Sequence, residues 1–506
     1  MHNVHYLTEQ MSGLNKYGYS YKFVYFNEYS YFCFMDKKQS LYLQIADNIE
    51  HQIKNDVLKI GDKLPSLRTI CSEKGVSMNT ASQAYLELES RGLIESRPQS
   101  GYYVSYSPKH SRKIPQTSQP IVANREDTPE LILDAISYNL PKAKIMLSTT
   151  LLSPELLPIA KLNKSIIEAT RTLPNSGVNY DREGNLKLKT QIAKRSLAWG
   201  GKLQADDIIP TGGSIDSISY CLLSLTNKGD TVAVESPIFF GFIRLAQSLG
   251  LNVLELPSSP ITGIDVDALK DAIETKNVKI VILVTNFSNP TGSCMPDENK
   301  KAVVQLMEKH NIPLIEDDIY ADLYFGNHRP VSCKTYDESG IVLWCGSFSK
   351  TLVSGYRVGW VSAGKFKEQV ARTKLYHSMA SSTITHEAIG NFLEVGRYEH
   401  HLRKLRLTLH RNSLQFQRCI NEYFPDDTKV TRPAGSLNMW VELNKNINTI
   451  DLYNKAMAHK ISIAPGRTYT LHNQYNNCFK LSYGLIFTPE IENGMKKLGE
   501  LVKGMG

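Results

Sequence analysis

The 506-residue chain has little of what marks a secreted, metal-binding or membrane-spanning protein. Its eight cysteines are scattered without CxxC pairs or metal-ligand spacing, which predicts reduced thiols and neither a disulfide framework nor a zinc site. Its longest apolar run, 278–284, is interrupted by Lys279 and is far shorter than the roughly 20 residues of a membrane helix. We therefore expect a soluble, cytoplasmic protein without a membrane partner.

Length and charge set only broad limits. A chain of this size with 42% apolar residues can bury one large and one small core, so we expect two unequal domains. The net charge of +8 is compatible with nucleic-acid binding but does not by itself indicate it. Residues 1–34, crowded with tyrosine and phenylalanine, lack the pattern of a secretion signal. We interpret them as an extension of uncertain origin, because recognisable pattern begins directly after Met35.

Residues 35–106 have the pattern of three helices and a hairpin. Apolar residues recur every fourth position over 41–53, which predicts a first amphipathic helix. Ser66 suits the start of a second helix that ends at Gly75, and Ser77 can cap a third helix that ends near Gly92. The short turn between the last two helices is typical of a helix-turn-helix. Two short strands, 93–96 and 102–104, predict a hairpin "wing" that completes an α+β module.

In a helix-turn-helix the start of the second helix of the pair enters the major groove of double-stranded DNA. A wing approaches phosphates or the minor groove. For any single polar residue a solvated surface role competes with this interpretation, whereas the ordered set favours DNA binding. The predicted DNA-contacting residues are Arg68, Ser77, Asn79, Thr80, Gln83, Arg97, Gln99, Ser100 and Gly101.

About seventy residues here resemble the GntR family of winged-helix regulators, through SLYLQIADNI, IGDKLPSLRTI and GVSMNTASQAYLELESRGLIESRPQSGYYV. One departure concerns Met78, which stands where that family commonly has arginine. The loss of this charge leaves the operator sequence and the affinity open.

The remainder of the chain divides into a linker and a large domain. Residues 107–135, which include a proline-containing polar stretch, predict an extended, partly flexible linker. In residues 136–506, helical stretches alternate with short apolar strands, which indicates a largely parallel sheet covered by helices. The strands are predicted at 231–234, 280–284, 313–315 and 341–344.

The large domain has residues suited to pyridoxal 5'-phosphate, which needs a Schiff-base lysine, an acidic partner for its ring nitrogen, phosphate donors and a flat neighbour. Lys350 follows a strand, where ligands of open α/β sheets bind. Arg357 and Ser347 could bind the phosphate, and Asp317 directly follows an apolar strand. Asp317 could instead pair with an arginine elsewhere. The other candidates are Gly212, Gly213 and Ser214 for the phosphate, Asn289 and Tyr320 for the phenolic oxygen, and Phe239 for stacking, although Phe239 taken by itself favours a core role.

These motifs resemble, in order, those of class I aminotransferases of fold type I: TGGS, ESPIFFGF, NFSNPTGS, EDDIYADL, SFSKTLVSGYRVGW and PAGSLNMWVEL. The resemblance covers most of residues 140–490. It implies Lys350 as the catalytic, cofactor-bonding lysine, Asp317 opposite the ring nitrogen, and a homodimer in which Tyr180 reaches the neighbouring site. Where such enzymes usually bind the substrate carboxylate with arginine, this chain has Lys480, with Asn289 as a second candidate for that carboxylate. Lysine lacks the planar fork of arginine, so ordinary transamination should be weakened unless Lys480 substitutes fully.

A GntR-type winged helix joined to an aminotransferase-like domain resembles the MocR subfamily of regulators. The resemblance implies a DNA-binding transcription regulator whose large domain senses an amine, an amino acid or the cofactor through Lys350. The main alternative is an active aminotransferase that transfers amino groups between amino acids and 2-oxo acids. A third interpretation, in which the large domain only dimerises the protein, leaves Lys350, Asp317 and Arg357 without a common purpose. The sequence leaves open the effector, the operator and the direction of regulation.

Overall fold

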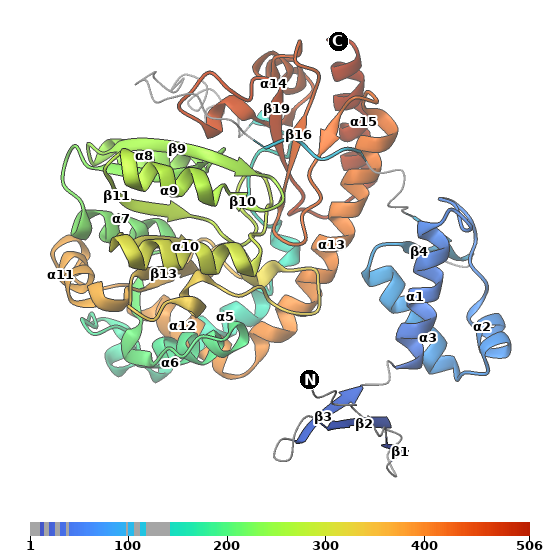
Figure 1. Ribbon diagram of the computed structural model, residues 1–506, viewed down its shortest axis with the longest axis horizontal. Helices are drawn as coiled ribbons and strands as arrows, with labels where there is room; N and C mark the ends of the chain where they lie inside the picture. The colour runs from blue at the N-terminus through green and yellow to red at the C-terminus, as the bar shows by residue number, and fades with distance from the viewer. Residues whose placement is uncertain are drawn as a thin grey trace, which may run out of the picture. The chain divides into compact units, whose positions relative to one another are not determined.

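The computed structural model describes residues 11–14, 20–25, 31–36, 40–97, 100–105, 112–117 and 142–506. The chain forms two compact units, Met1–Lys109 and His110–Gly506 (Figure 1). No helix in the described ranges is long and apolar enough to cross a membrane.

The first unit contains a strand meander and a helical module. Strands β1 (Met11–Leu14), β2 (Ser20–Tyr25) and β3 (Tyr31–Asp36) pair antiparallel in chain order. Helices α1 (Leu41–Lys54), α2 (Leu67–Lys74) and α3 (Met78–Ser90) precede the antiparallel hairpin of β4 (Ile94–Arg97) and β5 (Gly101–Val104). The predicted three helices and wing are therefore confirmed, with strand limits shifted by one residue.

Local side-chain chemistry explains where these helices begin and end. The Ser66 and Ser77 hydroxyls accept hydrogen bonds from the backbone N–H of Thr69 and Thr80, each at 3.1 Å, which satisfies a free donor in the first turn. Gly75 ends α2 in the left-handed conformation with φ 62°, which glycine adopts without a steric penalty. These caps set the short turn between α2 and α3.

The helical module has a small apolar core and one cluster of ion pairs around an arginine. Ile45, Ile49 and Ile53 of α1 pack with buried residues of α3 such as Tyr85, whose hydroxyl donates to the Pro65 carbonyl at 2.7 Å. Arg91, after α3, bonds Asp47 and Glu50 of α1 at 2.5 Å each, and Glu87 of α3 at 3.0 Å. The first and third helices are thus held together by both apolar packing and a shared arginine.

An eight-stranded sheet organises the second unit, in the order β10-β9-β8-β11-β12-β13-β14-β7. Strands β9, β8, β11, β12 and β13 run parallel, whereas β14 is antiparallel to both of its neighbours. The predicted parallel sheet is confirmed. The strands are β7 (Ile209–Thr211), β8 (Thr231–Ser236), β9 (Asn252–Ser259), β10 (Gly263–Ile264), β11 (Val278–Leu283), β12 (Leu314–Asp317), β13 (Val342–Ser347) and β14 (Gly359–Ser362).

Helices cover both faces of this sheet. Helices α9 and α10 lie in front of it in Figure 1, whereas α8 packs on the opposite face. Helix α12 packs against both α5 and α6. The covering helices are α5 (Ile159–Thr172), α6 (Leu186–Ser196), α7 (Ser214–Leu225), α8 (Phe240–Ser248), α9 (Val266–Thr275), α10 (Asp297–His310), α11 (Lys367–Ser378) and α12 (Thr383–Glu394).

A smaller layer follows toward the C-terminus. Its four-stranded antiparallel sheet has the order β15 (Lys429–Val430), β16 (Asn438–Glu442), β19 (Cys478–Ser482), β18 (Ala464–Pro465). Helices α13 (Arg397–Tyr423) and α15 (Pro489–Lys503) lie side by side, and α14 (Thr449–Ala458) contacts α15 (Figure 1). Strand β6 (Ile145–Met146) pairs in parallel with β17 (Ile461–Ser462), so the chain enters the second unit beside this layer.

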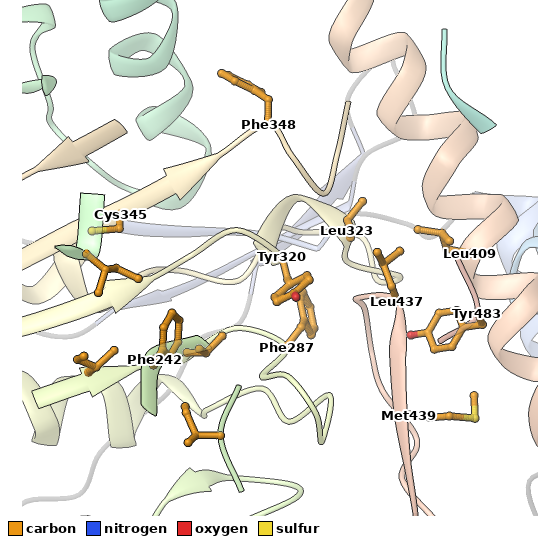
Figure 2. Close-up of a cluster of buried hydrophobic side chains, with 14 of the residues drawn as sticks. Phe242, Phe287, Tyr320, Leu323, Cys345, Phe348, Leu409, Leu437, Met439 and Tyr483 are labelled. Atoms are coloured by element: carbon orange, nitrogen blue, oxygen red, sulfur yellow. The ribbon is translucent and has the colours of Figure 1, made fainter. Parts of the chain in front are cut away.

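One continuous apolar core joins the large sheet to the smaller layer. Figure 2 shows Phe287 and Tyr320 beside Leu323, with Leu437 and Leu409 following toward the smaller layer. These side chains are almost fully buried, which makes the two layers one packed body. The walls of any cavity between them are therefore held in fixed positions.

Candidate functional site

A cavity of about 370 Å³ opens where the large sheet meets the smaller layer. It lies at the carboxyl ends of strands β11 and β12 and beside the start of α7, the position that ligands of open α/β sheets occupy. The lining residues used below are Thr150, Ser214, Phe239, Phe240, Asn289, Asp317, Tyr320, Ser349, Lys350, Arg357, Tyr469 and Lys480.

Asp317 ends strand β12 and is 2% exposed. Burial, with the neighbouring negative charge of Asp318 as a second cause, raises the pKa of its carboxyl group to about 8, and Lys350 opposes this shift. Among the described residues, nothing forms a hydrogen bond with its Oδ1 atom. A buried carboxylate oxygen without a partner is costly, so this atom is suited to a cationic N–H donor on a ligand in the cavity.

Lys350 follows β13 and extends into the cavity, where its Nζ atom donates to the Thr150 carbonyl at 2.8 Å. Burial lowers the pKa of Lys350 to about 8; Asp317 opposes this shift and Arg357 adds to it. A larger share of such a lysine is neutral near physiological pH than of an ordinary lysine. A neutral amine is the form that attacks a carbonyl group.

One end of the cavity is built for an anion. Ser214 begins α7 and lines the cavity, and the first N–H groups of a helix have no acceptor within the helix. Gly213, which precedes it, has φ 132°. A Cβ on Gly213 would lie 2.6 Å from Arg357 Nη2, so only glycine lets the guanidinium approach this backbone. Arg357 itself has φ 53° and is exposed, with its Nη1 atom 3.5 Å from Ser349 Oγ.

The predicted phosphate ligand Ser347 is not among the residues that line this cavity. Its hydroxyl donates to the Val358 carbonyl at 2.9 Å and accepts from Ser349 N–H at 3.1 Å. These bonds hold the turn after β13, and Ser349 lines the cavity in its place. Gly212, which precedes the helix start, leaves room for the Asp216 carboxylate, which a Cβ at this position would overlap.

Asn289 and Tyr320 come together, as the sequence predicts. Asn289 Nδ2 donates to the Tyr320 hydroxyl at 3.4 Å, and both residues are buried. Within the described parts of the chain, Asn289 Oδ1 has no hydrogen-bond partner. Burial raises the pKa of Tyr320 above its ordinary range, so its hydroxyl stays protonated. Phe239 lines the cavity beside Phe240, with the ring centroids 4.7 Å apart.

Lys480 lies on β19, 3% exposed, and reaches the same cavity. Its Nζ atom donates to Thr150 Oγ1 at 2.7 Å and lies 6.0 Å from the centroid of the Tyr469 ring. Burial, with the charge of Lys350 as a second cause, lowers the pKa of Lys480 to about 7. An anionic ligand group would offset this burial and favour the charged lysine.

Tyr180 does not join the cavity of its own chain. It is 57% exposed, and its hydroxyl accepts a hydrogen bond from Arg182 Nη2 at 3.3 Å. The structure thus separates it from the other predicted cofactor residues.

The predicted DNA-binding residues lie on the surface of the first unit. Asn79 and Gln83 are exposed one turn apart on α3, and Arg68 is exposed on α2. In the wing, Arg97 bonds Glu95 at 2.8 Å and stacks 4.3 Å from the centroid of the Tyr103 ring. At the start of α3, the hydroxyl groups of Ser77 and Thr80 are hydrogen-bonded to each other. In the wing, the Ser100 hydroxyl is hydrogen-bonded to the Tyr103 hydroxyl at 2.7 Å, and Gly101 has φ 108°. Gln99 lies outside the described residues.

Sequence analysis missed several lining residues. Thr150 contacts both lysines, one through its carbonyl and one through its hydroxyl. Tyr469 is 2% exposed and Phe240 lies beside Phe239. Thr150 and Tyr469 belong to no motif quoted above, whereas Phe240 lies in ESPIFFGF and Ser349 in SFSKTLVSGYRVGW, so these two could have been singled out.

Comparison with known proteins matches both units. Residues 157–498 match the family model "Aminotransferase class I and II", and residues 41–104 match "Bacterial regulatory proteins, gntR family". The HTH-type transcriptional regulator YjiR of Escherichia coli strain K12 is 33% identical over 463 residues, which is 91% of this chain and 98% of YjiR. This chain belongs to the MocR subfamily of GntR-type regulators.

A second regulator matches over most of the chain. The HTH-type transcriptional regulator YdcR, also of Escherichia coli K12, is 33% identical and covers 91% of this chain, which spans 99% of YdcR. Among solved structures, an archaeal alanine:glyoxylate aminotransferase has a TM-score of 0.70 at 23% identity, over 75% of this chain and 96% of the enzyme. The α-aminoadipate aminotransferase LysN of Thermus thermophilus has a TM-score of 0.68 at 24% identity, over 73% and 94%. This MocR-type chain is thus a transcription regulator with an aminotransferase fold.

Proposed function

We propose that this regulator holds pyridoxal 5'-phosphate in the cavity and senses an amine or amino acid there. The observation that carries the proposal is that the buried Asp317, whose Oδ1 has no hydrogen-bond partner among the described residues, lines the same cavity as Lys350 and Arg357. A bound pyridoxal phosphate supplies an aldehyde that bonds reversibly to amines. The residues present fit this group at its nitrogen, its aldehyde and its phosphate.

Each side chain has a separate task in this proposal. Asp317 would accept the ring N–H, Asn289 and Tyr320 would donate to the phenolic oxygen, and Phe239 would cover the ring. The phosphate would take the N–H groups at the start of α7 and the hydrogen bonds of Ser214, Ser349 and Arg357. We assign the phosphate hydroxyl to Ser349 rather than Ser347, because the Ser347 hydroxyl is committed to its own turn.

The ligand's own carboxylate would lie near Lys480. This lysine is a point charge, whereas an arginine would bind the carboxylate through two parallel hydrogen bonds and fix its orientation. A loosely oriented ligand favours binding over turnover, which supports a sensor rather than an active aminotransferase. The effector would act through a difference in affinity between two arrangements of the protein with different affinity for DNA.

The remaining assignments belong to the same proposal. We infer a winged-helix domain at 35–106, a linker at 107–135 and an aminotransferase-like domain at 136–506, preceded by an extension at 1–34. A homodimer would bring Tyr180 of one chain to the cavity of the other, and would read an operator of two half-sites. The residues proposed to contact that operator are Arg68, Ser77, Asn79, Thr80, Gln83, Arg97, Gln99, Ser100 and Gly101.

A visible absorbance titration tests the proposal. Protein loaded with pyridoxal phosphate is titrated with a panel of amines and amino acids, with Lys350→Ala as the control, and the cofactor is recovered and analysed by chromatography. A sensor changes its spectrum on ligand binding while the recovered cofactor remains pyridoxal phosphate. Rapid conversion to pyridoxamine phosphate, reversed by a 2-oxo acid, would identify an aminotransferase instead. A Lys350→Ala spectrum identical to that of the wild type would exclude both.

A further inference from the structure

Part of the predicted linker between the DNA-binding module and the large domain is hydrogen-bonded to the large domain. Residues 112–117 lie within the predicted linker, yet they pack on the smaller layer of the second unit. Arg112 inserts its guanidinium at the carboxyl end of α13, where Nη2 donates to the Asn421 carbonyl at 2.8 Å and to the Phe424 carbonyl at 3.1 Å. The side chain is only 11% exposed.

These carbonyl contacts have a clear physical basis. The last carbonyl groups of a helix have no hydrogen-bond donor within the helix, and they carry the negative end of its dipole. A buried cation at this end donates hydrogen bonds to these carbonyls and neutralises the partial negative charge. Arg112 also pairs with Asp426 at 3.1 Å, but that carboxylate is fully exposed and adds little. The two carbonyls therefore account for most of the stabilisation by the side chain.

The backbone of the segment is held as well. Val430 N–H, on edge strand β15, donates to the Lys113 carbonyl at 2.9 Å, and Arg432 Nη2 donates to the Arg112 carbonyl at 2.7 Å. Pro115 is buried behind them. Strand β15 pairs with β16, which pairs with β19, so the segment is joined to the sheet that carries Lys480.

We propose that the end of α13 and strand β15 form a docking surface for the chain's own segment Arg112–Pro115, and that this dock sets the working length of the tether to the DNA-binding unit. With the segment docked, six residues, 106–111, separate Ser105 at the end of the wing from Arg112, and they span at most about 25 Å. Without the dock the tether would be 36 residues, 106–141, with a maximum span of about 130 Å. A short tether keeps two DNA-binding units of a dimer at high effective concentration for paired half-sites.

Insertions on either side of the dock test this proposal, which rests on the proposed function in taking the protein to bind a two-half-site operator as a dimer. A 12-residue Gly-Ser stretch is placed after Lys109 or after Asn124, and affinity is measured on duplex DNA that the wild type has selected from a random pool. The first insertion lengthens the docked tether threefold and should weaken binding roughly fivefold, following the −3/2 power of length. The second lies beyond the dock and should leave affinity unchanged. Equal effects of the two insertions would overturn the proposal.

Hydrogen exchange tests the dock without DNA. In the full-length protein, Arg112→Ala should accelerate exchange of the Val430 amide at least tenfold, because the acceptor carbonyl of Lys113 is released. Arg403→Ala is the matched control, because it removes an exposed arginine from α13, the helix whose end Arg112 contacts. It should leave the exchange rate of the Val430 amide unchanged. Unchanged exchange in Arg112→Ala would refute the dock. If the wild-type protein selects no DNA from the pool, while Arg112→Ala still accelerates exchange of the Val430 amide, the proposed function is contradicted and the dock is not.

Discussion

Asp317 lowers the stability of the cofactor-free protein, whereas in the proposed function it stabilises bound pyridoxal phosphate. Burial raises its pKa to about 8, whereas an aspartate in an unfolded chain titrates near 4. Between these values the folded state holds a proton that the unfolded state has released. Stability of the cofactor-free protein contributed by this group is therefore present at low pH and falls as the pH rises toward 8.

Asp317→Asn should remove that dependence. Relative to the wild type, the cofactor-free variant should gain stability between pH 5 and pH 7, by roughly 1.4 kcal/mol for each pH unit at most. The same change should weaken pyridoxal phosphate binding at least tenfold, because the amide cannot neutralise the ring N–H. Thermal unfolding across pH and a cofactor titration check the two effects. A variant with an unchanged pH profile would show that Asp317 is ionised in the empty cavity.

Lys480 decides how well the site distinguishes amino acids from simple amines. Lys480→Arg should raise the affinity for L-alanine about tenfold through a two-pronged contact, and leave the affinity for ethylamine unchanged. Lys480→Met should weaken only the binding of L-alanine. Absorbance titrations of the loaded variants measure these affinities. If both ligands respond equally in both variants, Lys480 does not bind the carboxylate.

At the scale of elements, Ser77 both caps α3 and belongs to the proposed DNA-binding surface. Ser77→Ala should lower the free energy of unfolding of the winged-helix unit by about 1 kcal/mol, since Thr80 N–H loses its acceptor. Ser77→Asp keeps a capping oxygen but adds a negative charge at the proposed DNA surface. It should therefore unfold like the wild type and bind DNA at least tenfold more weakly.

Thermal unfolding and DNA binding by fluorescence anisotropy distinguish these variants. Thr488→Asp adds the same charge at the N-cap of α15 in the second unit and should change neither property. Wild-type affinity in Ser77→Asp would mean that the start of α3 does not face DNA.

The elements also show which features a sequence can predict. The starts of α2 and α3 follow from one serine each, and the end of α2 follows from Gly75, because capping is chemistry between neighbouring residues. The parallel strands were predictable from apolar runs between helices. The small sheet β15-β16-β19-β18 was not, because its strands are short and the pairing joins residues far apart in the chain.

The same limit applies to the candidate site. Asn289, Asp317, Lys350 and Arg357 belong to ordered motifs and converge on one cavity. Thr150 contributes a backbone carbonyl to Lys350 across 200 positions, and a carbonyl leaves no trace in residue type. Ser347 and Ser349 are both plausible phosphate ligands by spacing, and only the hydrogen bonds of the turn distinguish them. The contacts of Arg112 lie inside a segment whose composition predicts an unattached linker.

At the scale of the whole molecule, the proposed dimer would account for the exposure of Tyr180, which does not line the cavity of its own chain. If each site takes Lys350 from one chain and Tyr180 from the other, Tyr180→Ala and Lys350→Ala should complement each other. Random pairing of the two variants makes half of the dimers mixed, and each mixed dimer has one intact site, so about a quarter of all sites should recover.

The measurement is the amplitude of the wild-type absorbance change with amino acid after the variants are mixed and allowed to exchange subunits. A mixture of Arg357→Ala with Lys350→Ala is the matched control. Both of these residues line the cavity of the same chain, so no mixed dimer contains an intact site and no signal should return. Equal recovery in the two mixtures would mean that the signal comes from substituted sites, and would contradict a shared site. If Tyr180→Ala keeps the wild-type signal by itself, Tyr180 lies outside the ligand site. If Tyr180→Ala is inactive and the first mixture recovers no signal, each site takes Tyr180 and Lys350 from the same chain.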